Sequence, residues 1–252
     1  MKNLFTRANV IAKKFINPKI GEFPTLLQIT IKIQNNGEKP FRPGQFCTFR
    51  IMEDVYRAYS IASSYKNFSE YSFLISCGHE GLGSNYFRNI SIGDEVVFLG
   101  PNGHFSVLQP VSKEIFIFCT GTGIAPFIPM LEFLTDNNCE TKINIIHGLR
   151  DESNLEFYQN IHKEFKNKCP NISSKFFLSQ PKLQLDSETS KGRISSAIKN
   201  MDFKNIDSSQ FYLCGHPEMV SEIFGILKKS GVSESNIMAE EFTSPGYFES
   251  QN

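Results

Sequence analysis

The segment from Ile115 to Pro126 constrains the fold of this chain most strongly. An apolar run, Ile-Phe-Ile-Phe, is followed directly by Cys-Thr-Gly-Thr-Gly-Ile-Ala-Pro. Gly121 and Gly123 allow tight backbone conformations, and Pro126 suits the first turn of a helix. Because the N–H groups of that first turn have no partner within the helix, they can face an anion. The segment therefore predicts a strand, a glycine turn and a helix, which belong to an α/β sheet. Taken alone, the turn either binds a phosphate or only connects the strand to the helix.

This turn differs from the two common nucleotide-binding loops. It contains no lysine, which a Walker loop requires, and Pro126 stands where the dinucleotide fingerprint has its third glycine. The next predicted strand, 143–147, ends in His147-Gly148 without the acidic residue that would hold a ribose. The sequence thus predicts a nucleotide-binding turn of another type.

A second motif lies upstream, where residues 57–60 read Arg-Ala-Tyr-Ser. Arg57 carries a permanent planar charge that suits a pyrophosphate. Tyr59 can stack on a flat ring, and the Ser60 hydroxyl can form a hydrogen bond with a ring nitrogen. Taken alone, the segment also fits a β-strand with alternating outward residues, and both interpretations stay open at this point.

The pattern of elements divides the chain into two halves. Apolar β-type runs separated by turn signals predict a small antiparallel β-barrel in the first half, at 26–33, 45–51, 57–62, 71–77 and 95–99. From residue 113 onward strands alternate with helical stretches, which predicts a doubly wound parallel sheet. Strands are expected at 115–119, 143–147, 174–178, 210–214 and 237–242, and helices at 125–136, 154–167, 192–200 and 217–229. We expect two domains, 1–110 and 111–252, the second with a C-terminal tail.

Charge and hydropathy exclude several classes of protein. Lys plus Arg and Asp plus Glu both number 26, so no general attraction to nucleic acid is expected. No apolar run reaches the roughly 20 residues that cross a bilayer, and the first residues lack the apolar core of a secretion signal. We therefore expect a cytoplasmic protein without membrane association.

The six cysteines are scattered and do not form a metal-binding motif. They occupy positions 47, 77, 119, 139, 169 and 214, and no Cys-x-x-Cys grouping is present. Neither a zinc ribbon nor an iron–sulfur domain is therefore expected, and the five histidines show no ligand spacing. We expect reduced thiols and no metal site.

Four motifs in order resemble the ferredoxin–NADP(+) reductase family. They are Arg-Ala-Tyr-Ser at 57–60, Gly-Leu-Gly-Ser at 81–84, Gly-Thr-Gly-Ile-Ala-Pro-Phe at 121–127, and Cys-Gly-His-Pro-Glu-Met-Val at 214–220. The resemblance covers about residues 41–242. It implies an FAD-binding barrel followed by a nicotinamide nucleotide-binding domain, with hydride passing between nicotinamide C4 and flavin N5.

The resemblance also implies roles for residues of the first half. Arg57 is expected to pair with the FAD pyrophosphate, Tyr59 to stack on the isoalloxazine, and Ser60 to form a hydrogen bond near N5. The remaining expected FAD-binding residues, which contact the flavin or its diphosphate, are Ala58, Leu82, Gly83 and Ser84.

In the second half, the resemblance implies that Gly121, Thr122 and Gly123 bind the nicotinamide nucleotide, with Thr122 also touching the flavin. Cys214, followed by Gly215, is expected to pack against the nicotinamide ring, although a strand-end cysteine can also be inert. Glu240 or Glu241 is expected to support proton and electron transfer, and Phe242 to shield the flavin. Residues 243–252 either cover the FAD adenine through Tyr247 or Phe248, or are disordered.

The choice between NADP and NAD depends on cations for the 2′-phosphate. NADP-using bacterial relatives place arginines after the second strand, after the third strand in a Ser-Arg pair, and in Gly-Arg-Ile. This chain has Arg150 and Arg193, but its middle pair is Ser179-Gln180. We expect NADP, with NAD as the alternative and Lys182 or Lys191 as substitutes for the missing arginine.

The resemblance implies an FAD-dependent oxidoreductase that exchanges a hydride with NADP(H) and single electrons with a ferredoxin or flavodoxin, and we expect it to be a monomer. The alternative is an NADH-preferring reductase component of an oxygenase or cytochrome system. A subunit of a larger electron-transfer complex and a non-enzymatic flavin- or nucleotide-binding module are further interpretations. A basic N-terminal cluster is either a docking patch for an acidic carrier or a solvated end: Lys2, Arg7, Lys13, Lys14 and Lys19.

Overall fold

The computed structural model describes residues 5–17, 25–35, 37–78, 80–137, 140–198 and 208–242. It divides into two compact units, each described below by itself. The first contains Met1–Val107, Ala125–Asn137 and Ser153–Ile161, and the second contains Leu108–Ile124, Asn138–Glu152 and His162–Asn252. The single domain boundary expected near residue 110 stays a prediction, because these units describe packing and not independent folding.

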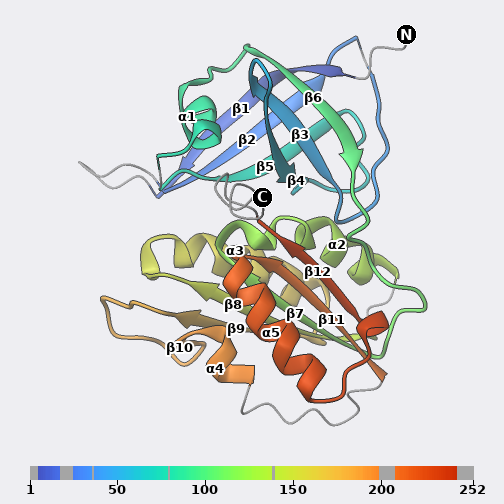
Figure 1. The fold of residues 1–252 in the computed structure, drawn as a ribbon, viewed down its shortest axis with the longest axis vertical. Helices are drawn as coiled ribbons and strands as arrows, with labels where there is room; N and C mark the ends of the chain where they lie inside the picture. Colours follow the sequence, from blue (N-terminus) through green and yellow to red (C-terminus); the bar gives the residue numbers. More distant parts are fainter. Residues whose placement is uncertain are drawn as a thin grey trace, which may run out of the picture. The chain divides into compact units, whose positions relative to one another are not determined.

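The first unit is built on a six-stranded antiparallel sheet that curves into a barrel-like shape (Figure 1). Its strands, in the spatial order β4-β3-β6-β1-β2-β5, are β4 (Val55–Ser60), β3 (Phe46–Met52), β6 (Glu95–Asn102), β1 (Thr6–Ile16), β2 (Leu26–Ile33) and β5 (Glu70–Ser76). Buried and more exposed side chains alternate along most of β1 and β3, as expected where one face of a sheet is packed.

Aromatic rings fill the interior of this sheet. Phe49 lies at the centre, with the rings of Phe73 and Phe87 edge-on at 5.0 and 5.3 Å. Phe87 comes from helix α1 (Leu82–Asn89), which follows β5. Burying this aromatic face therefore ties α1 to the sheet, and it fixes where the first turn of α1 lies.

Strand β1 was missed from the sequence because polar residues interrupt its apolar pattern. It lies inside the sheet, between β6 and β2. Lys13 Nζ donates to the carbonyls of Arg88 and Ile90 at 2.7 Å each, so it caps the C-terminal end of α1. Arg7 forms an ion pair with Glu95. Arg7 stays exposed within this ion pair, so the two interpretations of the basic cluster, a docking patch or a solvated end, stay predictions; Lys2 and Lys19 lie outside the described residues.

The second unit is built on a six-stranded parallel sheet. Its order is β10-β9-β8-β7-β11-β12, from β10 (Thr189–Lys191), β9 (Ile172–Leu178), β8 (Lys142–Leu149), β7 (Glu114–Thr120), β11 (Ser209–Gly215) and β12 (Ile237–Glu241). Helices α4 (Ile194–Ile198) and α5 (Pro217–Lys229) cover one face (Figure 1). Their apolar side chains pack on Phe118, Ile146 and Leu213 of the sheet.

Because side chains alternate between the two faces of a strand, the neighbours of those residues point to the opposite face. There, residues paired in register form one row across five strands: Phe176, His147, Cys119, Cys214 and Glu240. This cross-sheet row lies one residue before the carboxyl ends of β7 and β11. It therefore supports the edge where a ligand is expected.

The predicted fold class, an antiparallel barrel followed by a parallel α/β sheet, is confirmed. Besides β1, the sequence analysis missed α1 and the short strand β10. The expectation of reduced thiols holds for Cys47, Cys77, Cys119 and Cys214, but it is wrong for Cys169, which is disulfide-bonded. Within the described ranges, no helix is long and apolar enough to cross a membrane.

Candidate functional site

In the first unit, Gly83 lies directly against Tyr59 and Arg57. A Cβ atom placed on Gly83 would collide with the Tyr59 hydroxyl and would lie 3.3 Å from Arg57 Cγ. Residues from β4 and from the first turn of α1 therefore meet at one place, although more than twenty positions separate them in the sequence. The packing requires glycine at position 83.

The Tyr59 ring packs against other aromatic rings and is partly exposed to solvent. Phe87 and Phe49 contact it edge-on at 5.1 and 6.1 Å. Desolvation by burial raises the pKa of the Tyr59 hydroxyl, so the phenol is neutral. A neutral ring held in this way can stack on a planar ligand without further ordering.

The first turn of α1 offers N–H groups to an anion. Gly81 occupies the N-cap position and provides no side-chain hydrogen bond, and the first turn contains no acidic residue. Leu82 is exposed, and the Ser84 hydroxyl donates to the Ser76 carbonyl at 2.8 Å, leaving oxygen lone pairs for another donor. With Arg57 nearby, this arrangement suits a diphosphate.

The other predicted residues of this unit lie on the same strand, with alternating directions. Ser60 is buried at the end of β4 and paired in register with Phe46, whereas Ala58 is exposed. The neutral aromatic ring, the arginine and the open helix turn together fit the flavin, ribityl and diphosphate parts of FAD.

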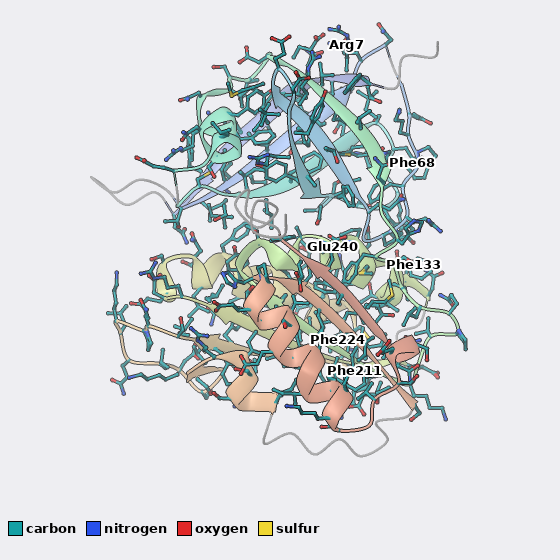
Figure 2. All side chains as sticks on the ribbon, viewed as in Figure 1. Arg7, Phe68, Phe133, Phe211, Phe224 and Glu240 are labelled. Carbon is teal, nitrogen blue, oxygen red and sulfur yellow. The ribbon has the colours of Figure 1, made fainter. Side chains whose placement is uncertain are left out.

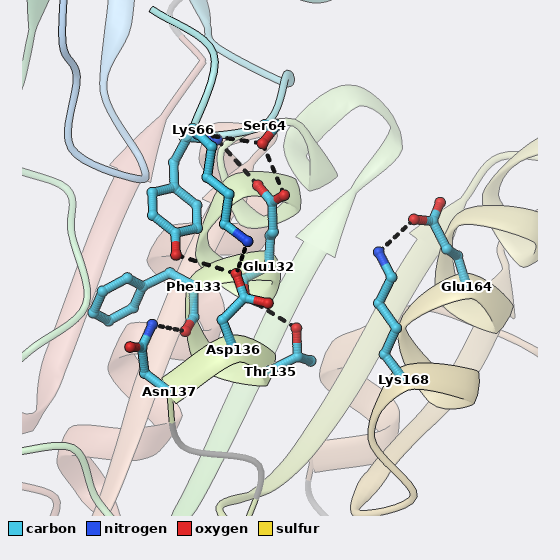
Figure 3. A network of polar contacts seen from close by, with 10 residues as sticks. Ser64, Lys66, Glu132, Phe133, Thr135, Asp136, Asn137, Glu164 and Lys168 are labelled. Atoms are coloured by element: carbon cyan, nitrogen blue, oxygen red, sulfur yellow. Dashed lines mark hydrogen bonds and ion pairs between the residues drawn. The ribbon is translucent and has the colours of Figure 1, made fainter.

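The segment that follows Ser60 is anchored by a polar network within the first unit (Figure 3). Ser64 Oγ donates to Glu132 Oε1 at 2.8 Å, and the Tyr65 N–H donates to Glu132 Oε2 at 3.0 Å. Lys66 pairs with Asp136 at 2.7 Å. Glu132 and Asp136 belong to α2 (Phe127–Asn137), so this helix holds the loop between β4 and β5. This network could not be predicted from the sequence, because neither carboxylate belongs to a motif.

In the second unit, the glycine turn lies at the switch point of the sheet. Strand β7 has β8 on one side and β11 on the other, which is where an open α/β sheet binds its ligand. Residues Gly121–Ile124 form a 3-10 turn, and Gly121 has a positive φ of 52°. A Cβ atom on Gly123 would collide with the Cys214 carbonyl. Gly123 therefore brings the turn against the end of β11, and Thr122 lies between the two glycines.

The end of β11 is held by a residue that the sequence analysis missed. Thr120 Oγ1 accepts a hydrogen bond from the His216 N–H at 2.9 Å, and a Cβ on Gly215 would collide with that same oxygen. Gly215 adopts a φ of 138°. His216 in turn caps α5 by accepting the Glu218 N–H at its Nδ1. In the sequence, Thr120 is marked only by its place in the Cys-Thr-Gly segment. Nothing in that segment shows that its hydroxyl contacts the end of β11.

Cys214 is fully buried in the cross-sheet row. Desolvation raises the pKa of its thiol, and the electrostatic effects of Glu240 and Cys119 act in the same direction. The thiol is therefore neutral, and it would not act as a thiolate nucleophile. Glu240, labelled in Figure 2, lies on β12 and is partly buried. Glu241 is exposed, and the Phe242 N–H donates to the Gly215 carbonyl at 2.9 Å. Tyr247, Phe248 and the rest of the tail lie outside the described residues.

The predicted cation site lies along the carboxyl edge of β8, β9 and β10. Arg150 Nε donates to Gln180 Oε1 at 3.1 Å, and the Gln180 N–H donates to the Arg150 carbonyl at 2.7 Å. The Ser179 hydroxyl lies 3.5 Å from that carbonyl. Gln180 therefore orients Arg150, instead of supplying a charge of its own.

Arg193 comes to the same edge through its neighbours in the sequence. The Gly192 N–H donates to the Leu178 carbonyl at 2.8 Å, and Ile194 packs against Gly148 at the end of β8. Arg193 itself is exposed and lies 3.7 Å from Glu218, a surface pair that contributes little. Its guanidinium can leave that pair for a phosphate.

Two models of known protein families match this chain. Residues 26–107 match the model of the oxidoreductase FAD-binding domain, and residues 117–223 match that of the oxidoreductase NAD-binding domain. The toluate 1,2-dioxygenase electron transfer component of Pseudomonas putida is 29% identical over 220 residues, which cover 86% of this chain and 63% of that protein. The chain thus spans less than two thirds of that relative.

Two further similar proteins match over most of their own length. The flavodoxin/ferredoxin–NADP reductase of Buchnera aphidicola is 27% identical over 237 residues, covering 87% of this chain and 90% of that protein. The crystal structure of a ferredoxin NADP+ reductase from Neisseria gonorrhoeae with bound FAD and NADP superposes with a TM-score of 0.78 at 23% identity, covering 96% of this chain and 100% of that one.

Proposed function

Because this chain belongs to the ferredoxin reductase-type oxidoreductases, with an FAD-binding domain followed by an NAD-binding domain, we propose that it transfers electrons between NADP(H) and a ferredoxin or flavodoxin. The resident cofactor is FAD. The proposal extends to the predicted roles of the site residues in both domains.

The choice of NADP rests on two arginines at the carboxyl edge of the parallel sheet. Arg150 is oriented by Gln180, and Arg193 is tied to the end of β9 through Gly192. A guanidinium can bind a phosphate through two parallel hydrogen bonds, so both suit a 2′-phosphate that NAD lacks. The similarity to a flavodoxin/ferredoxin–NADP reductase over 90% of that protein supports the same choice.

The flavin, when bound, accepts two electrons as a hydride and returns them singly. The work of the protein is binding and alignment. Arg57 and the first turn of α1 hold the diphosphate, Tyr59 supports the flavin ring, and Ser60 contributes a hydroxyl near its reacting edge. Gly121, Thr122 and Gly123 bind the nucleotide pyrophosphate, and the neutral Cys214 side chain supports the nicotinamide face. Glu240 or Glu241 supports proton and electron transfer, and Phe242 shields the flavin.

A second candidate is an NADH-dependent reductase component of an oxygenase or cytochrome system. Gln180 favours it, because an uncharged residue stands where NADP-using relatives have an arginine. The similarity to the electron transfer component of a dioxygenase points the same way, although this chain spans 63% of that relative. The two candidates differ in nucleotide and in electron acceptor, so both can be tested together.

The test is an anaerobic stopped-flow titration of the purified FAD-loaded protein with NADPH and with NADH, followed at the flavin absorbance. We expect rapid bleaching by NADPH and at least tenfold slower bleaching by NADH. Faster bleaching by NADH would favour the second candidate, and no bleaching by either nucleotide would overturn both. Reduction of ferredoxin, flavodoxin and cytochrome c by the reduced protein then compares the classes of acceptor.

A further inference from the structure

Two buried histidines, which no sequence motif connects, lie behind the glycine turn of the second unit. His147, on β8, is 0% exposed and His162, on α3 (Leu155–Lys168), is 1% exposed. Nδ1 of His147 lies 3.2 Å from Nε2 of His162, and Nε2 of His147 lies 2.9 Å from the Gly121 carbonyl oxygen. The three residues form a hydrogen-bonded chain from α3, through β8, to the first residue of the turn.

The acceptor at the end of this chain determines the positions of its protons. The Gly121 carbonyl can only accept, so Nε2 of His147 must carry a hydrogen and donate it. Nδ1 of a neutral His147 is then an acceptor, and the hydrogen between the rings belongs to Nε2 of His162. Desolvation lowers the pKa of both imidazoles, to about 4 for His147, so both rings are neutral near pH 7.

Fixing the Gly121 carbonyl also fixes the N–H of Thr122. The two groups belong to one planar trans peptide and point in opposite directions. With the carbonyl held toward His147, the Thr122 N–H must point away from it. Gly121 has a φ of 52°, and apart from its two chain neighbours no heavy atom of the described residues lies within 4 Å of where its Cβ would be, so the space on that side of Gly121 is open.

We infer that His147, oriented by His162, is a positioning residue of the nucleotide site: it holds the Gly121–Thr122 peptide with its N–H directed at the pyrophosphate. This inference rests on the proposed function, because it assigns a role in binding the nucleotide. His147 touches neither cofactor. It acts through the turn, and His162 acts through His147.

Packing alone does not explain imidazole rings at these positions. Both rings stack near Phe176, with ring centroids 5.4 Å from it for His147 and 4.7 Å for His162. In the described part of the chain, Nδ1 of His162 is buried without a hydrogen-bond partner, which is unfavourable. A phenylalanine would fill similar space without that penalty, so the value of the pair lies in the donors it presents.

The test compares two nucleotide probes on the FAD-loaded full chain by isothermal titration calorimetry. NADP+ contains the pyrophosphate, whereas 2′-AMP carries the 2′-phosphate and lacks it. We expect His147→Phe to raise the dissociation constant of NADP+ by about five- to tenfold, as for one lost hydrogen bond. The constant for 2′-AMP should stay within about twofold. His147→Gln, whose amide can donate from the Nε2 position, should recover most of the NADP+ affinity.

Phe176→Leu is the matched control, because it loosens the packing around both rings and leaves the hydrogen bonds in place. It should lower the melting temperature and leave the ratio of the two dissociation constants unchanged. Equal weakening of NADP+ and 2′-AMP in His147→Phe, or NADP+ affinity within twofold of wild type, would overturn the inference.

Two further results separate failure of a variant to fold, failure of this inference and failure of the proposed function. If His147→Phe does not fold, His162→Phe replaces it; loss of the tautomer-setting donor should weaken NADP+ by about threefold, and an unchanged ratio of constants would overturn the inference. If the wild-type protein binds neither NADP+ nor NAD+, the proposed function itself fails, before the histidines are considered.

Discussion

Cys214 and Glu240 are paired in register across the parallel strands β11 and β12, on the face of the sheet opposite α4 and α5. The charge of Glu240 adds to burial in raising the pKa of the Cys214 thiol. In the proposed function this neutral, compact thiol supports the nicotinamide ring at the end of β11, and burial makes it unavailable as a nucleophile.

We therefore predict that Cys214→Ala retains FAD but slows reduction of the flavin by the preferred nucleotide by about tenfold, as the loss of ring alignment implies. Anaerobic stopped-flow absorbance measures the rate, and the flavin-to-protein absorbance ratio measures FAD content. Cys119→Ala is the matched control, because Cys119 is buried in the same row on the neighbouring strand. Equal rates in wild type and Cys214→Ala would remove Cys214 from the site.

Tyr59→Ala should weaken FAD binding by about tenfold, because an aromatic stacking contact contributes about 0.5–1.5 kcal/mol beyond burial. Tyr59→Phe keeps the ring and should bind FAD within about threefold of wild type. Fluorescence released on dilution of the purified protein reports the dissociation of FAD. If both variants behave alike, the ring is not the binding element.

Gly83→Ala should both destabilise the protein and reduce FAD content, because the new Cβ collides with the Tyr59 hydroxyl. Tyr59→Phe removes the colliding oxygen and leaves the nearest ring carbon, Cζ, at 3.5 Å, an ordinary contact. The double variant should thus recover more than half of the lost stability in a double-mutant cycle measured by urea unfolding. Additive losses would show that the two residues do not interact.

Arg193→Ala should raise the KM for NADPH by about tenfold and leave the KM for NADH unchanged, because only the former carries a 2′-phosphate. Gln180→Arg should lower the KM for NADPH relative to the KM for NADH. Lys168→Ala serves as a control for the loss of a surface charge, since Lys168 pairs with Glu164 within α3. A parallel change for both nucleotides in Arg193→Ala would contradict the assignment.

The buried histidines predict a loss of stability in mild acid. Unfolded histidine titrates near pH 6.5, and burial lowers the pKa of His147 to about 4. Between these values the unfolded chain binds more protons, so the stabilisation is complete above pH 6.5 and is lost as the pH falls toward 4. For His147 alone this amounts to about 3 kcal/mol. Burial, the electrostatic effect of His147 and the charge of Lys166 lower the pKa of His162 in the same direction, and the neighbouring Cys119 thiol is neutral.

Urea unfolding between pH 4 and 8 measures this slope, the change in the free energy of unfolding with pH. His147→Gln removes one titrating group and should flatten it, whereas Phe176→Leu should lower stability equally at every pH. A slope that His147→Gln leaves unchanged would assign the acid sensitivity to other groups.

The sequence alone determined the two architectures and the turn. Alternating apolar runs before residue 108, and strands alternating with helices after it, predicted an antiparallel barrel and a parallel sheet, because periodicity reflects which face each element buries. The glycines at 121 and 123 marked the turn, because only small residues allow such close backbone approach. Strand β1 was not predicted, because its polar residues make tertiary contacts: Lys13 caps α1, and Arg7 pairs with Glu95.

Contacts between residues far apart in the sequence follow from the folded chain alone. The contact of Gly83 with Tyr59, the bond from His216 to Thr120 and the chain from His162 to Gly121 join positions that no local pattern relates. Such contacts depend on strand order and register, which are set by packing of the whole sheet. Sequence periodicity assigns a residue to a face of its strand, but the neighbouring strand determines what that residue touches.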